Sequence, residues 1–100
     1  MLRLTVEKGE PAGEVFELKP GENTLGRSRA ATFRLSSADV SGLHARILVA
    51  DGVARLENLS QFGVRLDDAP VKGIVTLISG QRLAVGKSTV LLFQQSGVPG

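Results

Sequence analysis

Hydrophobic and polar residues alternate along most of this chain with a period of two, which is the pattern of a half-buried β-strand. The first run places Leu2, Leu4 and Val6 on one face and polar side chains on the other. The same pattern predicts strands over residues 2–7, 15–18, 23–25, 33–35, 44–50, 53–59, 64–66, 74–78, 81–85 and 89–93. No stretch of ten or more residues has helical periodicity. Many short strands separated by turns favour an all-β fold, an antiparallel β-sandwich.

Turn-forming residues separate these runs. Asp51-Gly52 lies between two alternating runs and is the strongest hairpin signal in the chain. Glycine, proline or aspartate marks the other predicted turns, at residues 9–13, 19–22, 67–70, 79–80 and 86–88.

The length and composition limit the class of protein. One hundred residues suit a single domain, and we assign residues 1–94 to the β-sandwich and residues 95–100 to a tail or the start of a linker. If a linker begins there, an attached effector would define the biological role. The chain has no cysteine, which excludes a disulfide framework and a thiolate metal site and fits a reducing, cytoplasmic location.

Neither a cofactor nor a membrane segment is expected. One histidine alone cannot form a histidine-rich metal site, so we predict no metal and no cofactor. No apolar run approaches the roughly 18 residues that a membrane-spanning segment needs. The N-terminal residues enter the strand pattern directly, without the pattern of a signal peptide.

Positive charge is concentrated in the middle of the chain, although the net charge is only +2. Four arginines stand against one acid between positions 27 and 46: Arg27, Arg29, Arg34 and Arg46 against Asp39. A local basic patch of this kind can attract an anionic partner. The chain has four Phe but no Trp or Tyr, so stacking platforms for single-stranded nucleic acid are scarce. Nucleic acid is therefore not the expected partner.

Gly86-Lys87-Ser88 resembles the end of a phosphate-binding loop, which needs a glycine, four further residues and then Gly-Lys-Ser or Gly-Lys-Thr. The position of the first glycine is Gln81, and Gly80 is one residue too far away. Such a loop also opens a helix, whereas an apolar, β-branched run follows here. We therefore predict a hairpin turn.

The chain offers no convincing set of catalytic groups. Asp67 and Asp68 precede Ala-Pro, which is typical of a solvated turn rather than of paired catalytic carboxylates or a metal site. Ser41 lies three residues before His44, but in a strand-forming stretch this spacing does not create a nucleophile–base pair. No acid that could orient the histidine is evident. We predict that the protein is not an enzyme.

Three short motifs contain an arginine, two serines, a histidine and glycines. They are Gly26-Arg27, Ser41-Gly42-Leu43-His44 and Ser60-Gln61-Phe62-Gly63-Val64. In this order and spacing they resemble the forkhead-associated (FHA) domain, whose pattern is Gly-Arg, then Ser-x-x-His, then Ser-x-Asn-Gly-Thr. Similar scaffolding runs from Leu2 to Phe93, so the resemblance covers over nine-tenths of the chain.

The resemblance implies a sandwich of eleven short strands whose loops at one end bind phosphothreonine peptides. Phosphothreonine carries about −1.5 to −2 charges and three acceptor oxygens, and arginine offers planar, permanently charged donors that match them. By resemblance Arg27 and Ser41 would contact the phosphate, and His44 would tie the loops together. Gly26 and Gly63 would serve tight backbone geometry. The implied phosphopeptide-binding set is Arg27, Ser41, Gly42, Ser60, Gln61 and Phe62.

Four positions depart from the family pattern. Gly42 stands where the family usually has Arg or Asn, so a side-chain donor is lost. Phe62 replaces the Asn that holds the backbone of the bound peptide, and Val64 replaces a Thr. Asp67 replaces a later Asn and adds a negative charge. The phosphate contacts therefore survive better than the contacts that orient the peptide.

These departures leave three functions open. The domain binds phosphothreonine with weakened or altered recognition, in which Phe62 supplies apolar contacts, or it is a phospho-independent scaffold or oligomerisation unit. A third reading is polyanion or nucleic-acid binding by the arginine patch, which would show a steep salt dependence without peptide preference. An exposed Phe62 would favour partner contact, and a buried one would be plain core. We predict a non-catalytic interaction module of a bacterial signalling or secretion protein.

Overall fold

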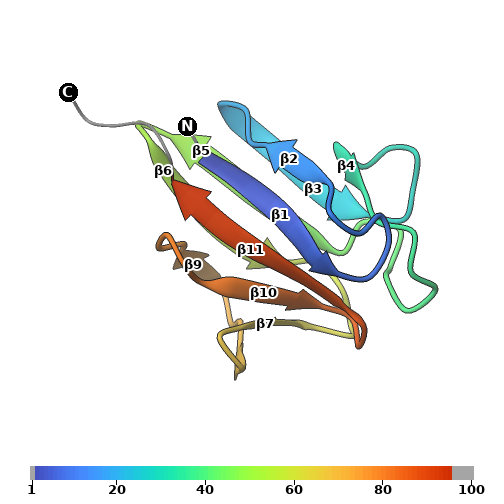
Figure 1. Ribbon diagram of the computed structural model, residues 1–100. Coiled ribbons are helices and arrows are strands. Elements are labelled where there is room, and N and C mark those ends of the chain that lie inside the picture. The colour runs from blue at the N-terminus through green and yellow to red at the C-terminus, as the bar shows by residue number, and fades with distance from the viewer. Residues whose placement is uncertain (1, 96–100) are drawn as a thin grey trace.

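The computed structural model describes residues 2–95, which form eleven strands in two packed sheets (Figure 1). The strands are β1 (Leu2–Lys8), β2 (Val15–Glu17), β3 (Gly21–Gly26), β4 (Phe33–Arg34), β5 (Ala45–Ala50), β6 (Val53–Asn58), β7 (Val64–Leu66), β8 (Ala69–Pro70), β9 (Ile74–Thr76), β10 (Arg82–Val85) and β11 (Thr89–Gln95). One sheet has the order β2-β1-β11-β10-β7-β8 and the other β4-β3-β5-β6-β9. Every pair except the parallel β3–β4 is antiparallel. The predicted antiparallel β-sandwich of about eleven short strands is confirmed.

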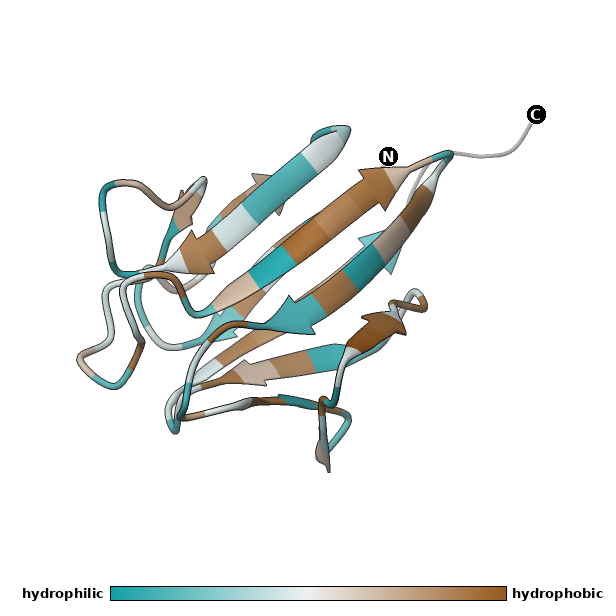
Figure 2. Cartoon of the chain, turned by 180° about the vertical axis from the view of Figure 1, so that it is seen from behind, coloured by the Kyte–Doolittle hydropathy of each residue, from teal (hydrophilic) through white to brown (hydrophobic). Residues whose placement is uncertain are grey.

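The core lies between the sheets because each strand turns its apolar positions inward. In β1, Leu2, Leu4 and Val6 are buried and the positions between them are half-buried. Brown and teal positions alternate along several strands in Figure 2, which shows the same period of two. Both sheets contribute fully buried side chains, among them Leu25, Ile47, Leu56, Leu83, Leu91 and Phe93. Full burial of each contributes about 1.5–3 kcal/mol, so the core stabilises the fold and leaves the loops free for function.

The two longest strands, β1 and β11, pair at the centre of the six-stranded sheet. Their register runs from Leu2 opposite Gln95 to Lys8 opposite Val90, with an irregularity between Val6 and Lys8. The first and last described strands thus lie side by side (Figure 1).

Phe16 of β2 and Phe33 of β4 close one side of the sandwich. These strands are edges of different sheets, and the two rings stack with their centroids 4.8 Å apart. Such a pair contributes about 0.5–1.5 kcal/mol beyond its area burial. Because Phe33 directly precedes Arg34, the stack also anchors the strand that carries this arginine.

Most strand ends agree with the sequence prediction to within one residue, and the larger differences lie at β3, β8, β9 and β11. β9 ends at Thr76 rather than at residue 78. Residues 67–70 were predicted as one turn, but only Asp67 and Asp68 turn, with φ of 48° and 69°, and Ala69–Pro70 forms β8 opposite β7. An edge strand tolerates a proline because its outer side needs no N–H donor. β3 begins at Gly21 rather than residue 23, and β11 continues to Gln95 rather than ending at 93. Residues 96–100 of the predicted tail lie outside the described residues.

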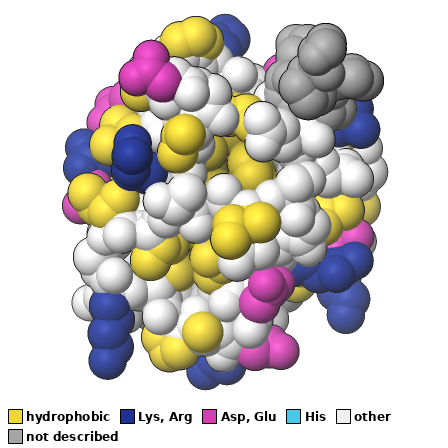
Figure 3. All heavy atoms as spheres, turned by 90° about the vertical axis from the view of Figure 1, so that its left-hand side faces the viewer, with side chains coloured by type: hydrophobic (Ala, Val, Ile, Leu, Met, Phe, Trp, Pro, Cys, Tyr) yellow, Lys and Arg dark blue, Asp and Glu magenta, His cyan; other side chains and the backbone are white. Residues whose placement is uncertain are grey.

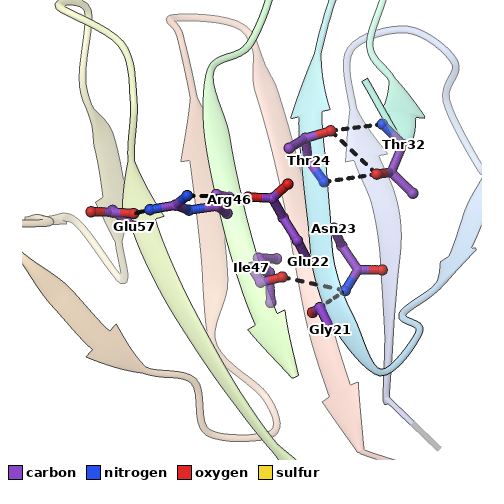
Figure 4. A network of polar contacts seen from close by, with 8 residues as sticks. All are labelled: Gly21, Glu22, Asn23, Thr24, Thr32, Arg46, Ile47 and Glu57. Atoms are coloured by element: carbon purple, nitrogen blue, oxygen red, sulfur yellow. Dashed lines mark hydrogen bonds and ion pairs between the residues drawn. The ribbon is translucent and has the colours of Figure 1, made fainter. Parts of the chain in front are cut away.

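A polar network covers part of the outer face of the five-stranded sheet (Figure 4). Arg46 of β5 reaches Glu22 of β3 at 3.1 Å and also pairs with Glu57 of β6. The hydrogen bond that Arg46 donates to Glu57, followed by the one that it donates to Glu22, raises the pKa of Arg46. These side chains are partly solvent-exposed, so the two ion pairs contribute little to stability. They link β5 to its neighbours β3 and β6.

Asn23 is a buried polar residue that the sequence analysis did not single out. Its amide nitrogen donates to the carbonyls of Lys19 at 2.8 Å, Gly21 at 3.2 Å and Ile47 at 3.3 Å. Its side-chain oxygen accepts from the Lys19 N–H at 2.9 Å. The side chain therefore satisfies the backbone of the β2–β3 turn from inside (Figure 4).

The two ends of the sandwich differ in character. At the right of Figure 1 the β3–β4, β4–β5 and β6–β7 loops come together; we call residues 27–32, 35–44 and 59–63 the loop end. The opposite end, in Figure 3, shows hydrophobic side chains toward its middle and charged ones mostly toward its edge. Within residues 2–95 no helix is long and apolar enough to span a membrane.

Candidate functional site

Gly26 allows the β3–β4 and β4–β5 loops to meet backbone to backbone. Beyond β3 the Arg27 N–H donates to the Ser41 carbonyl and the Ser28 N–H to the Gly42 carbonyl, both at 3.0 Å. A Cβ atom at Gly26 would lie 2.0 Å from the Gly42 carbonyl oxygen, a distance that sterics forbid. Gly26 is therefore needed for close approach, and this approach sets Arg27 next to Ser41.

His44 joins two of the loops through both ring nitrogens. It is fully buried, and the Ser41 N–H donates to its Nδ1 at 3.0 Å. Because Nδ1 accepts, Nε2 carries the proton and donates to the Gly63 carbonyl at 2.8 Å. Gly63 has φ of 80°, a conformation that favours glycine. With both nitrogens occupied and no bond to the Ser41 hydroxyl, His44 is placed as a brace and not as a general base.

Two serine hydroxyls from different loops form a pair. The Oγ atoms of Ser41 and Ser60 are 2.7 Å apart. Ser60 is buried, and its Oγ also accepts from the Phe62 N–H at 3.1 Å. The Asn58 side chain holds the Ser60 backbone through bonds of 2.8 and 3.1 Å. Ser60 is thus a fixed support, and the half-buried Ser41 is the member of the pair that a ligand can reach.

The β3–β4 loop is held in shape by its own side chains. Thr24 and Thr32 exchange backbone-to-hydroxyl bonds of 3.0 and 2.8 Å across its base (Figure 4). The Ser28 hydroxyl accepts from the Ala30 N–H at 3.0 Å. The exposed Arg27 side chain therefore stands on an ordered backbone.

An open pocket of about 440 Å³ lies between the β3–β4 and β4–β5 loops. Its lining is basic and hydroxyl-rich: Arg27, Ser28, Arg34, Ser36 and Gly42. Arg34 was part of the predicted basic patch but not of the predicted site. Its Nε donates to the Arg27 carbonyl at 2.9 Å, which brings its guanidinium over the loop. Charge clustering along residues 27–46 was the only sequence signal for it.

The other residues of the predicted phosphopeptide-binding set lie at the surface of the loop end. Gly42 is exposed, and a Cβ there would meet only the Ser28 Cβ, at 3.7 Å, so the position has room for a side chain. Gln61 and Phe62 are exposed, and the Phe62 side chain is 65% accessible. Phe62 also lines a hollow of about 600 Å³ together with Arg65 and Lys87. The exposure of Phe62 favours a role in contacting a partner over a role in the hydrophobic core.

Asp39 locks the β4–β5 loop to the β10–β11 turn. Its carboxylate accepts from the Lys87 N–H, from the Ser88 N–H at 3.0 Å and from the Ser88 hydroxyl at 3.1 Å. The Lys87 amide, followed by the Ser88 groups, lowers the pKa of Asp39 from its ordinary 3.8. The predicted hairpin turn at Gly86-Lys87-Ser88 is confirmed, and the anion that its backbone binds is this internal carboxylate.

The variant Asp39→Asn should unfold more easily at neutral pH. Because the folded-state pKa is lowered, the carboxylate stabilises the protein above the unfolded pKa, and this stabilisation is lost as the pH falls through the folded pKa. The difference between wild type and variant should be full at pH 6–7 and should shrink as the pH falls below the ordinary carboxylate pKa of 3.8. Urea unfolding across pH measures it, with Asp51→Asn in the exposed hairpin as the control; a constant difference at all pH values would contradict the assignment.

The loop end is suited to binding an anion and not to bond chemistry. Among residues 2–95, Arg27, Arg29 and Arg34 form no ion pair with a carboxylate. In the same part of the chain no three His, Cys, Asp or Glu side chains gather as a metal site would require. The result is uncompensated positive charge beside a reachable hydroxyl.

Comparisons with known proteins identify the family and the fold. A family model described as FHA domain matches residues 23–86. The chain is 31% identical over 90 residues to the FHA domain-containing protein FhaA of Mycobacterium tuberculosis (strain ATCC 25618 / H37Rv), covering 89% of this chain and 17% of that protein. A solved domain from a study of phosphothreonine-dependent FHA domain interactions has TM-score 0.86 and 28% identity, over 97% of this chain and 98% of that one. The FHA domain of FhaA, solved in complex with the intracellular domain of another protein, has TM-score 0.84 and 29% identity, over 94% and 100%.

Proposed function

Since this chain belongs to the forkhead-associated (FHA) domain family, whose members are non-catalytic phosphothreonine-binding interaction modules, we propose that its loop end binds phosphothreonine in a partner protein. The observation that carries the proposal is the direct backbone bond between Arg27 and Ser41. This bond brings the backbone of Arg27, whose permanently charged side chain lines the open pocket, next to Ser41, the chain neighbour of the lining residue Gly42.

Arg27 and Ser41 would bind the phosphate in complementary ways. The guanidinium matches two phosphate oxygens as a planar fork, and each charge-assisted bond contributes about 1.5–3 kcal/mol. Ser60 can donate to the Ser41 oxygen, which leaves the Ser41 proton for the ligand. The Gly26 contact and the His44 brace hold the backbones of Arg27 and Ser41 in place before the ligand arrives, which reduces the ordering cost of binding.

Recognition of the peptide around the phosphate would differ from the family pattern. Gly42 offers no side-chain donor, and Phe62 offers an exposed ring in place of an amide. We propose that Phe62 contacts apolar side chains of the partner, so that affinity for the phosphate is kept while backbone recognition is weakened.

A second function is favoured by the same exposed ring. A phospho-independent partner or a second copy of the chain could cover Phe62 without using the arginines. The FhaA domain was solved with the intracellular domain of another protein, which supports protein interaction as the broad role. The chain spans 17% of FhaA, so the role of any longer protein is itself proposed, as a part of bacterial signalling. A secretion role and a cytoplasmic location stay predictions from the sequence.

The deciding experiment is capture from a phosphothreonine peptide library, with the unphosphorylated library alongside. Selective capture that Arg27→Ala abolishes would support the proposal. Equal capture of both libraries by the folded domain would favour the phospho-independent function. Binding that collapses with salt and shows no sequence preference would indicate polyanion binding by the arginine patch instead.

Replacing Phe62 by asparagine should tighten phosphopeptide binding by about 2- to 10-fold, since one new backbone hydrogen bond contributes about 0.5–1.5 kcal/mol. Stability should change little because the ring is exposed. Titration calorimetry with one phosphopeptide measures the effect, and Phe62→Ala separates the gained amide from the lost ring. Weaker binding by both variants to the same degree would mean that the ring, not the missing amide, governs this position.

A further inference from the structure

Arg34 gives the pocket beside Arg27 a second guanidinium. It lies in β4, which the Phe16–Phe33 stack anchors, so its backbone is fixed by the core and not by the loop. One of its five N–H donors is used, by Nε to the Arg27 carbonyl at 2.9 Å. The other four N–H donors form no hydrogen bond or ion pair with residues 2–95, and the Arg34 side chain is exposed.

The pocket is larger than one phosphate requires. Its volume of about 440 Å³ lies within the range of roughly 300–1,000 Å³ that holds drug-sized ligands. Ser41 does not line the pocket, so a phosphate bound between Arg27 and Ser41 would lie at the edge of the pocket beside Gly42. Arg34 and Ser36 line the remainder, and no carboxylate of the described residues neutralises that part.

We propose that Arg34 forms a second anion subsite, which selects an acidic group near the phosphothreonine of the partner: the carboxylate of Asp or Glu, or a second phosphate. The proposal rests on the proposed function, because the bound phosphothreonine fixes which residues of the partner peptide lie near Arg34. It adds a specificity that the phosphate contacts alone do not provide, since a planar fork discriminates an acidic from a neutral side chain.

The position of the subsite sets the direction of the preference. The pocket is lined from the β3–β4 and β4–β5 sides, with no residue of the β6–β7 loop. Ser60 and Phe62 lie beyond Ser41, through the paired hydroxyls and the Phe62 N–H bond. The acidic group should therefore lie on the side of the phosphothreonine away from Phe62. An extended peptide advances about 3.3 Å per residue, so it should lie about one to three residues from the phosphothreonine.

The test is a matched set of peptides against the wild type and three variants. Each peptide carries one phosphothreonine, and a scan places alanine, aspartate, glutamate or phosphoserine at each position within three residues on either side. The variants are Arg34→Gln, Arg34→Lys and Arg29→Gln. Arg29 is an exposed arginine of the neighbouring β3–β4 loop that does not line the pocket, so it controls for loss of charge at a distance.

We expect the wild type to prefer an acidic over an alanine peptide by about 10- to 100-fold at one or two positions on one side only, the range of one charge-assisted contact. Arg34→Gln should remove this preference and weaken the alanine peptide less than about threefold. Arg29→Gln should keep it. Arg34→Lys should keep part of it, since the charge stays and the fork is lost. Aspartate and phosphoserine peptides show which acidic group the subsite takes.

Two results would overturn the second subsite while leaving phosphothreonine binding intact. One is equal affinity of the wild type for acidic and alanine peptides. The other is an equal loss for both peptides in Arg34→Gln, which would mean that Arg34 holds the same phosphate or merely positions Arg27. Failure of the folded wild type to bind any phosphopeptide would instead overturn the proposed function, and the subsite with it.

Discussion

Replacing Arg27 by alanine should weaken the binding of a phosphothreonine peptide by at least about 100-fold, with almost no change in stability. Two charge-assisted bonds to the phosphate contribute about 1.5–3 kcal/mol each, and 1.4 kcal/mol corresponds to a factor of ten in affinity. The side chain is exposed and forms no ion pair within residues 2–95, so the free energy of unfolding should shift by less than about 0.5 kcal/mol.

Calorimetric titration of a single phosphopeptide, together with urea unfolding, measures both quantities. Arg29→Ala is the matched control, because it removes an equal charge from the same loop and should cost less than about threefold at moderate salt. An equal loss of affinity in the two variants would mean that Arg27 contributes only to the positive charge of the loop and does not contact the phosphate. An unfolded Arg27→Ala variant would mean that the side chain has a structural role that its exposure does not indicate.

Replacing His44 by alanine should lower the free energy of unfolding by about 3–5 kcal/mol, a large part of the 5–15 kcal/mol typical of a domain. The substitution empties the space of a fully buried ring and leaves the Ser41 N–H and the Gly63 carbonyl without their partner. A buried polar group without a partner costs about 1–3 kcal/mol, and the cavity adds to it.

Chemical denaturation at one temperature checks this value, with Leu43→Ala as the neighbouring control. Leu43 is 43% exposed, so its truncation should cost less than about 1 kcal/mol. A stable His44→Ala domain that still binds phosphopeptide normally would show that the loops keep their arrangement without the brace. If Arg27→Ala lowered stability and His44→Ala weakened only binding, the roles assigned to the two residues would be reversed.

The fold was largely readable from the sequence because alternation reports which face of a strand meets the core. That signal is local, and it located ten of the eleven strands. It missed β8 because Ala69–Pro70 is an exposed edge of two residues, with no buried position to create a pattern. It also placed the start of β3 too late, since Gly21 and Glu22 are exposed and carry no apolar signal.

The sequence predicted only those parts of the site that short motifs indicate. Glycine, serine and histidine at fixed spacings indicated the three loops, but the contacts that assemble them join distant residues. The Ser41–Ser60 hydroxyl bond spans 19 positions, and the bond between Asp39 and the Lys87 N–H spans 48. No pattern in one chain encodes such pairings, and Arg34 was invisible as a pocket residue for the same reason.

The pairing of β1 with β11 also determines when this domain can be completed. The strands are partners at the centre of one sheet, yet Leu2 must wait for Gln95 to be made before its ladder can close. At a synthesis rate of about 5–20 residues per second, this delay is roughly 5–20 s. The five-stranded sheet, whose strands all lie between Gly21 and Thr76, has shorter separations to close. Loop closure over long separations slows folding. In the nascent chain β1 can pair early with β2, but its edge toward β11 stays open until synthesis of the domain is almost complete.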